Sequence, residues 1–309
     1  MNTLVSKLIE NMEKIIIGKR TVLEILLTAL LCEGHVLIED VPGVGKTQMV
    51  AALARSVSGV FHRVQFTPDV MPSDIMGFSM FNPATREFEY REGAAVCNFL
   101  LADEVNRSSP KTQSSLLEIM EEFQVTVDGK TYPLPRPFMV MATQNPIESF
   151  GTYPLPEAQL DRFFLKLTIG YPDKSQESEI LDRYGSNNPI KSLEPVSSLT
   201  DILSLQEQVK GVHVEDVLKG YIVDIIEQTR KSEFVALGAS PRGSLNLYRA
   251  AKARAFIRGR DYILPDDIQE MAVLVLPHRL LMNSDARMKG MTVEEIVTQA
   301  VSRVQVPVF

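Results

Sequence analysis

The sequence lacks the features of a membrane-spanning, secreted or disulfide-stabilised protein. It contains no tryptophan, only two cysteines, and no apolar run of the roughly 18 residues that a membrane-spanning helix needs. Its N-terminal stretch, MNTLVSKLIENMEK, carries acidic residues where a signal peptide has an uninterrupted apolar segment. Cys32 and Cys97 lie in apolar surroundings, as reduced core thiols do. We therefore expect a cytoplasmic protein without direct membrane insertion.

An excess of positive charge and a metal-ligand pattern are also missing. The net charge is −7 over 309 residues, which argues against a surface built to bind nucleic acid. A single basic run occurs, and on a helix it would spread over more than one face. The histidines are scattered without ligand spacing. The basic residues are Lys252, Arg254, Arg258 and Arg260, and the histidines are His35, His62, His213 and His278.

The order of apolar segments predicts an α/β fold. A chain of 309 residues suits two domains. Two amphipathic helices are expected in residues 4–33, and short apolar segments then alternate with helical patterns, which indicates a parallel sheet flanked by helices. A helix is expected over Lys174–Tyr184, a polar hinge follows, and helical spacing runs from about Leu199 to the end. The expected strands are Val36–Ile38, Val64–Phe66, Phe99–Leu101, Met139–Ala142 and Leu165–Ile169.

Two β-hairpins are expected to interrupt this alternation. Residues Gly77–Tyr90 alternate in polarity around an Asn-Pro-Ala-Thr turn. Residues Phe123–Leu134 alternate around Asp128-Gly129, which is the strongest short-range hairpin signal. Both hairpins follow elements that belong to the expected ligand-binding edge of the sheet.

Residues 40–48, DVPGVGKTQ, form the most informative stretch. They lie between an apolar strand candidate and an apolar helical pattern. In a strand–loop–helix of this kind, successive N–H groups and the helix N-terminus can hold a phosphate. Lys46 would reach the outer phosphates, and the Thr47 hydroxyl would hold Mg²⁺. A buried strand with a solvated loop behind it is the alternative.

Asp40 stands where the phosphate-loop pattern has glycine. A carboxylate aimed at phosphates would repel them. We therefore predict that Asp40 faces away from the phosphates and bonds to backbone N–H groups that hold the turn.

Two further strand candidates end in polar side chains. Asp103 and Glu104 follow the buried segment Asn98–Ala102, and Thr143-Gln144-Asn145 follow Phe138–Ala142. Ligands bind at the carboxyl ends of parallel strands. Asp103 would contact Mg²⁺, and Glu104 would orient and polarise an attacking water, because phosphoryl transfer depends mainly on positioning. An amide at the tip of the second strand, such as Asn145, can bond to both the γ-phosphate and that water.

These motifs, in this order, resemble those of AAA+ ATPases, and more narrowly those of the MoxR family. The resemblance rests on three phrases: VQFTPDVMPSDIMG at 64–77, LADEVNRSSPKTQSSLLEIMEE at 101–122 and FMVMATQNPIESFGTYPLPEAQLDRF at 138–163. It covers nearly the whole chain. It implies a P-loop AAA+ core over residues 1–187 with two inserted hairpins, and a C-terminal all-α lid over 188–309.

The resemblance also implies roles for individual residues. Asn145 is similar to the family's sensor-1 residue, and Arg162 to an arginine finger that reaches a neighbouring subunit's γ-phosphate. Arg242 is similar to a sensor-2 arginine that opens a lid helix, acting within its subunit or across to the next. Arginine in a first helical turn opposes the helix dipole, which favours a functional reason for Arg242. The expected nucleotide-binding residues are Ile16, Ile17 and Gly18 at the adenine, with Asp40, Val41, Pro42, Gly43, Val44, Gly45, Lys46, Thr47 and Gln48 in the phosphate loop.

The function implied is Mg²⁺-dependent ATP hydrolysis in a homo-oligomer, generally a hexamer, that remodels or matures other proteins. The family's usual partners carry a von Willebrand factor A domain. This chain has no D-x-S-x-S run of that domain's metal site, so such a partner would be a separate chain. A nucleic-acid motor, a nucleotide-binding scaffold without turnover and a metal-chelatase motor subunit are the alternatives.

Overall fold

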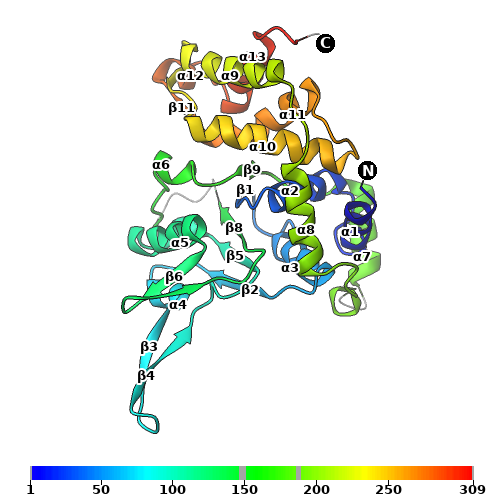
Figure 1. Ribbon diagram of the computed structural model, residues 1–309. Helices are drawn as coiled ribbons and strands as arrows, with labels where there is room; N and C mark the ends of the chain where they lie inside the picture. Colours follow the sequence, from blue (N-terminus) through cyan, green and yellow to red (C-terminus); the bar gives the residue numbers. More distant parts are fainter. Residues whose placement is uncertain (1, 146–150, 186–188, 308–309) are drawn as a thin grey trace.

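The computed structural model describes residues 2–145, 151–185 and 189–307. A central sheet has helices on both sides, the helices of residues 216–302 gather beyond one edge of it, and a long hairpin extends away from the opposite side (Figure 1). The predicted domain boundary at residues 187–188 is outside the described residues.

The sheet is parallel and has five strands, which confirms the predicted fold class. The second strand begins at Phe61 and not at Val64. It lies at one edge of the sheet, where its alternating, half-exposed side chains give only a short apolar signal. The strands, in order across the sheet, are β2 (Phe61–Gln65), β5 (Phe99–Asp103), β8 (Met139–Gln144), β1 (Val36–Glu39) and β9 (Leu165–Leu167).

Alternation along the strands divides the apolar side chains between two cores. Ile38 and Met141 lie in one core and Leu37 and Val140 in the other, because successive side chains point to opposite faces of a strand. The first core continues into helices on both sides of the predicted domain boundary. It includes Leu26 as well as residues of α9 (Asp216–Lys231), α10 (Pro241–Ile257) and α11 (Pro265–Val275). The first core therefore joins the sheet to the C-terminal helices.

The helices before residue 187 flank the sheet. Their ends carry the expected signals: Asp173 caps the helix Lys174–Tyr184 by accepting from the N–H of Gln176. These helices are α1 (Thr3–Glu13), α2 (Arg20–Leu31), α3 (Lys46–Ser56), α4 (Pro72–Met76), α5 (Pro110–Glu122), α6 (Glu157–Leu160) and α7 (Lys174–Tyr184).

The remainder of the chain is mainly helical, as predicted, with one short strand pair that was not predicted. β10 (Val235–Leu237) pairs antiparallel with β11 (Leu281–Met282). Strands of two or three residues leave no periodicity to read in a sequence. The helices are α8 (Leu199–Lys210), α9 (Asp216–Lys231), α10 (Pro241–Ile257), α11 (Pro265–Val275), α12 (Ser284–Met288) and α13 (Val293–Ser302). In the described part of the chain, none of the helices is both long enough and apolar enough to cross a membrane.

Both predicted hairpins are confirmed. β3 (Gly77–Asn82) pairs with β4 (Glu87–Glu92), and β6 (Gln124–Val127) pairs with β7 (Lys130–Pro133). The Asp128-Gly129 turn has both φ angles positive, 50° and 76°. The two hairpins touch at their bases, where the rings of Tyr90 and Tyr132 stack with centroids 4.1 Å apart.

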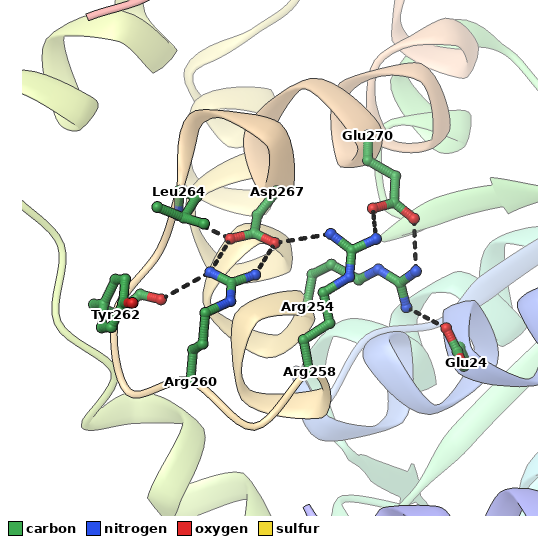
Figure 2. Close-up of polar contacts among 8 residues, drawn as sticks. All are labelled: Glu24, Arg254, Arg258, Arg260, Tyr262, Leu264, Asp267 and Glu270. Atoms are coloured by element: carbon green, nitrogen blue, oxygen red, sulfur yellow. Dashed lines mark hydrogen bonds and ion pairs between the residues drawn. The ribbon is translucent and has the colours of Figure 1, made fainter. Parts of the chain in front are cut away.

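The three arginines of the basic run, Arg254, Arg258 and Arg260, form ion pairs inside the protein (Figure 2), and Lys252 donates to the backbone carbonyl of Lys210. Arg254 is 4% exposed and bridges Glu24 of α2 to Glu270 of α11, at 2.8 and 2.7 Å. Arg260 binds the fully buried Asp267 at 2.6 Å. Arg258 reaches both of these α11 carboxylates. The run therefore fastens α10 to α11 and to α2.

His35 has a structural role, although no metal-ligand spacing surrounds it. It lies in the loop before β1 and is buried between α5 and β8. Its Nε2 donates to the carbonyl of Met120 at 2.8 Å, and its Nδ1 accepts from the N–H of Val140 at 2.9 Å. The ring is thus neutral, because a proton on Nδ1 would face another donor.

Stability should fall in mild acid partly through this ring. Burial lowers the pKa of His35 from 6.5 to about 4. Between these values the unfolded chain binds a proton that the folded chain does not, so the contribution is complete above pH 6.5 and decreases toward pH 4. The loss amounts to about 3 kcal/mol.

We expect His35→Gln to flatten the pH dependence of the free energy of unfolding between pH 4 and 6.5, measured by denaturant titration. His213→Gln, at an exposed histidine, is the control. An unchanged slope in His35→Gln would contradict the assignment.

Candidate functional site

The loop between β1 and α3 has the backbone of an anion-binding turn. Gly43 and Gly45 have φ angles of +86° and +89°, which L side chains rarely adopt. A Cβ at either glycine would meet no atom within 4 Å, so open space lies above the loop. Gly45 is the N-cap of α3, and the positive end of that helix faces this space.

Lys46 begins α3 and is half-buried. Its Nζ donates to the backbone carbonyl of Asp40 at 2.9 Å, which folds the side chain over the loop. Burial lowers the pKa of Lys46, and the carboxylates of Asp103, Asp40 and Glu104 oppose that shift. A cation enclosed in this way is ready to pair with an anion.

The orientation predicted for Asp40 is confirmed. One carboxylate oxygen accepts from the N–H groups of Ile169 and Gly170, at 2.7 and 2.8 Å, and the other accepts from the N–H of Val41 at 2.8 Å. Asp40 is buried and ties the start of the loop to the segment after β9. Asp40 and Val41 hold the turn and do not line either cavity beside it.

Asp103 and Glu104 end β5 next to the tip of β8. The hydroxyl of Thr143 donates to Asp103 Oδ1 at 2.6 Å and accepts from the N–H of Glu104 at 2.9 Å. One buried hydroxyl therefore orients both residues. Arg63 of β2 forms an ion pair with Asp103 Oδ2 at 2.7 Å.

Glu104 is held in an uncommon conformation. Its φ is 56°, in the left-handed region that non-glycine residues seldom occupy and that is enriched at functional sites. Its carboxylate accepts from Gln65 Nε2 at 2.8 Å and pairs with Arg107 at 3.1 Å. The backbone strain and the side-chain bonds together fix the carboxylate at the edge of the sheet.

These groups surround a cavity of about 360 Å³, which we call the phosphate cavity. It brings together most of the predicted phosphate and metal residues. Its oxygen donors, the Thr47 hydroxyl and the Asp103 carboxylate, suit Mg²⁺. Gln48 Oε1 is buried and has no hydrogen-bond partner among the described residues, so the cavity wall also has an unused acceptor. The lining residues are Pro42, Gly43, Gly45, Lys46, Thr47, Gln48, Arg63, Gln65, Asp103, Glu104, Thr143 and Asn145.

A second, more apolar cavity of about 280 Å³ adjoins the same loop. Ile16 and Ile17, predicted at the adenine, line it together with Val44, and it shares Gly43, Gly45 and Gln48 with the phosphate cavity. Gly18 is absent from the lining and has a positive φ of 68° where the chain turns beside Gln176. Pro172, Ile180 and Tyr184 also line this cavity and were not predicted as site residues.

Arg162 and Arg242 lie together, but away from the phosphate cavity. Both pair with the carboxylate of Glu121, Arg162 at 3.4 Å. They line a separate cavity of about 320 Å³, the arginine cavity, with Glu121, Phe164 and Arg249. Glu121 lies on an exposed face of α5, and both of its arginine partners come from distant parts of the chain.

Arg63, Gln65 and Thr143 were not predicted as site residues. Arg63 and Gln65 alternate along β2 and end at the carboxyl edge of the sheet, and Thr143 is the first residue of the predicted polar tip of β8, where no role was given to it. That alternation was the available signal. Only the alignment of β2 with β5 and of β5 with β8 brings the three side chains to the carboxylates.

Comparisons with known proteins agree with this geometry. Residues 35–165 match a family model described as "ATPase family associated with various cellular activities (AAA)", and residues 227–300 match an AAA lid domain. The uncharacterized protein YeaC of Bacillus subtilis is 52% identical over 308 residues, which cover 100% of this chain and 96% of YeaC.

Two further similarities extend over almost the whole chain. Chaperone MoxR1 of Mycobacterium tuberculosis is 45% identical over 304 residues, which cover 96% of this chain and 80% of MoxR1. The crystal structure of a candidate ATPase from Cytophaga hutchinsonii superposes with a TM-score of 0.92 at 39% identity, over 99% of this chain and 95% of that one. Together with the phosphate loop, the parallel sheet and the helical lid, these similarities show that the chain belongs to the MoxR family of AAA+ ATPases.

Proposed function

We propose that this ATPase hydrolyses Mg²⁺-bound ATP at sites that two neighbouring subunits complete. The observation that supports this proposal most strongly is that Lys46 lies in the phosphate cavity, whereas Arg162 and Arg242 lie together in the arginine cavity. A single subunit thus offers its phosphate-binding groups and its arginines at two different places on its surface.

The residues of the phosphate cavity suit distinct tasks in this reaction. Lys46 and the loop N–H groups would bind the outer phosphates. Glu104 would accept a hydrogen bond from the attacking water, and the amide of Asn145 would bond to that water and the γ-phosphate. Thr47 and Asp103 would hold Mg²⁺, which supplies charge neutralisation at the phosphates. Ile16 and Ile17 would cover the adenine base.

Arg162 and Arg242 would stabilise the transition state at the neighbour's phosphates. Such arginines contribute roughly 10³–10⁵ in rate, so a lone subunit should be nearly inactive. Both arginines pair with Glu121 and therefore lie side by side, which supports action of both on the same neighbouring subunit. Assembly then becomes the step that switches hydrolysis on.

The larger role that we propose is the remodelling or maturation of partner proteins by a hexameric ring in the cytoplasm. One relative at 45% identity carries the name chaperone. Residues 1–187 would act as the nucleotide-binding core and residues 188–309 as its lid. A protein with a von Willebrand factor A domain is the proposed client. The ion-paired basic run on α10 gives no support to a nucleic-acid motor.

Glu104→Gln should abolish turnover while ATP stays bound. The amide keeps the shape of the side chain but is a poor acceptor for the attacking water, so phosphate release should fall at least ~100-fold. The measurements are phosphate release and retention of labelled ATP. Glu10→Gln on α1, an exposed residue, is the control. Turnover at the wild-type rate would refute the role of Glu104.

Subunits that lack different halves of the site should rescue each other. Arg162→Ala should bind ATP normally and fail to hydrolyse it, and Lys46→Ala should fail to bind it. In an equal mixture, about a quarter of head-to-tail contacts would combine an intact Lys46 with a neighbour's intact Arg162. ATPase assays of the mixture test this, and no recovery at any mixing ratio would exclude action across subunits.

Thr143→Val should slow hydrolysis more than it weakens binding. The substitution keeps the shape of the side chain but removes both hydrogen bonds that orient Asp103 and Glu104. Misplaced catalytic groups cost on the order of 10²-fold in rate. Steady-state kinetics with parallel ATP-binding measurements separate the two effects. Thr126→Val on the exposed hairpin β6–β7 is the control. An unaltered rate in Thr143→Val would show that the hydroxyl has no positioning role.

A further inference from the structure

Glu121 holds the two arginines of the arginine cavity with one carboxylate. It lies in the last turn of α5 and is 38% exposed. Its Oε1 pairs with Arg242, in the first turn of α10, and its Oε2 pairs with Arg162, just after α6. The three residues are far apart in sequence, so only the fold brings them together.

The backbone around both arginines is anchored by a separate set of bonds. Asp161, which precedes Arg162, accepts a hydrogen bond from Ser240 at 3.0 Å and forms an ion pair with Arg279 at 2.9 Å. Ser240 is the N-cap of the helix that carries Arg242, and the side chain of Arg279 is 1% exposed. The segments that carry the arginines are therefore fixed to each other without Glu121.

The side chains of the arginines remain accessible. Arg162 is 33% exposed and Arg242 is 41% exposed, and both border an open cavity. A guanidinium group binds a carboxylate and a phosphate through the same planar set of donors. Glu121 thus occupies the place that an incoming phosphate oxygen would take.

We propose that Glu121 is a positioning residue that keeps Arg162 and Arg242 paired in the free subunit and yields them to the neighbour's γ-phosphate on assembly. This inference rests on the proposed action of both arginines across the subunit contact. The anchored backbone means that the exchange requires only side-chain movement. Assembly with bound ATP then competes directly with an internal ion pair.

This competition predicts how far the loss of the Glu121 charge should shift the subunit concentration needed for activity. Exposed ion pairs are weak, and the neighbour's phosphate must displace two of them. Removing the charge of Glu121 should therefore lower the subunit concentration that gives half-maximal ATPase activity by roughly two- to twentyfold. The rate at saturating subunit concentration should stay within about twofold of wild type, because Glu121 gives up the arginines in the assembled site.

The test compares Glu121→Gln with Glu118→Gln in the full-length chain. Glu118 is an exposed acid on the same helix and borders, with Glu121 and Arg162, a further cavity of about 310 Å³, so its variant controls for the loss of one negative charge on this face. ATPase activity with Mg²⁺–ATP is measured against subunit concentration for both variants. Thermal unfolding of each variant shows that it is folded. Glu121→Gln should shift the half-maximal concentration and Glu118→Gln should not.

A second arm checks that Glu121 acts through the arginines. In an Arg242→Ala background one of the two displaced pairs is already gone, so Glu121→Gln should shift the subunit concentration for half-maximal association by a smaller factor. Association in the presence of Mg²⁺–ATP is followed by light scattering in both backgrounds, because Arg242→Ala removes an arginine that turnover itself needs. Equal shifts in both backgrounds would overturn the proposal, as would an unchanged concentration or a large loss of rate at saturation in Glu121→Gln. If mixed Arg162→Ala and Lys46→Ala subunits recover activity while Glu121→Gln behaves as wild type, only this inference fails. If the mixture stays inactive, the action across subunits fails instead.

Discussion

The common direction of the five strands is the constraint on which the site depends. In a parallel sheet the carboxyl ends of all strands meet at one edge. Lys46, Asp103 and Asn145 each follow a different strand and therefore converge there. The Thr143 hydroxyl fixes the positions of Asp103 and Glu104, since it donates a hydrogen bond to the Asp103 carboxylate and accepts one from the N–H of Glu104. The Asp40 carboxylate does the same for the loop by binding the backbone after β9.

The positive charges that the proposed reaction needs lie at two separate places on the subunit. The phosphate cavity has a half-buried lysine among carboxylates, whereas Arg162 and Arg242 share the single carboxylate of Glu121 elsewhere. Arg254, Arg258 and Arg260, at and after the end of α10, are likewise paired with carboxylates of α2 and α11. Arg162 and Arg242 differ from Arg254, whose side chain is 4% exposed, because they remain 33% and 41% exposed.

Sequence patterns predicted the fold well where elements were long or had a strong local signal. The Asp128-Gly129 turn and the helix Lys174–Tyr184 required no tertiary information, because turn preferences and capping are local. The pair β10–β11 was missed because its strands are too short to show alternation. The start of β2 was misplaced because an edge strand has a weak apolar signal.

The sequence by itself determined the chemistry of the site: a phosphate loop ending in Lys46, two carboxylates after a buried strand, and an amide after the next. Their order along the chain was enough because each motif is local. The tertiary structure alone decided the partners of these groups. It places Arg63 in an ion pair with Asp103, and it places both Arg162 and Arg242 in ion pairs with Glu121. Such pairings depend on strand register and on how the lid packs against the core, and neither leaves a trace in the local sequence.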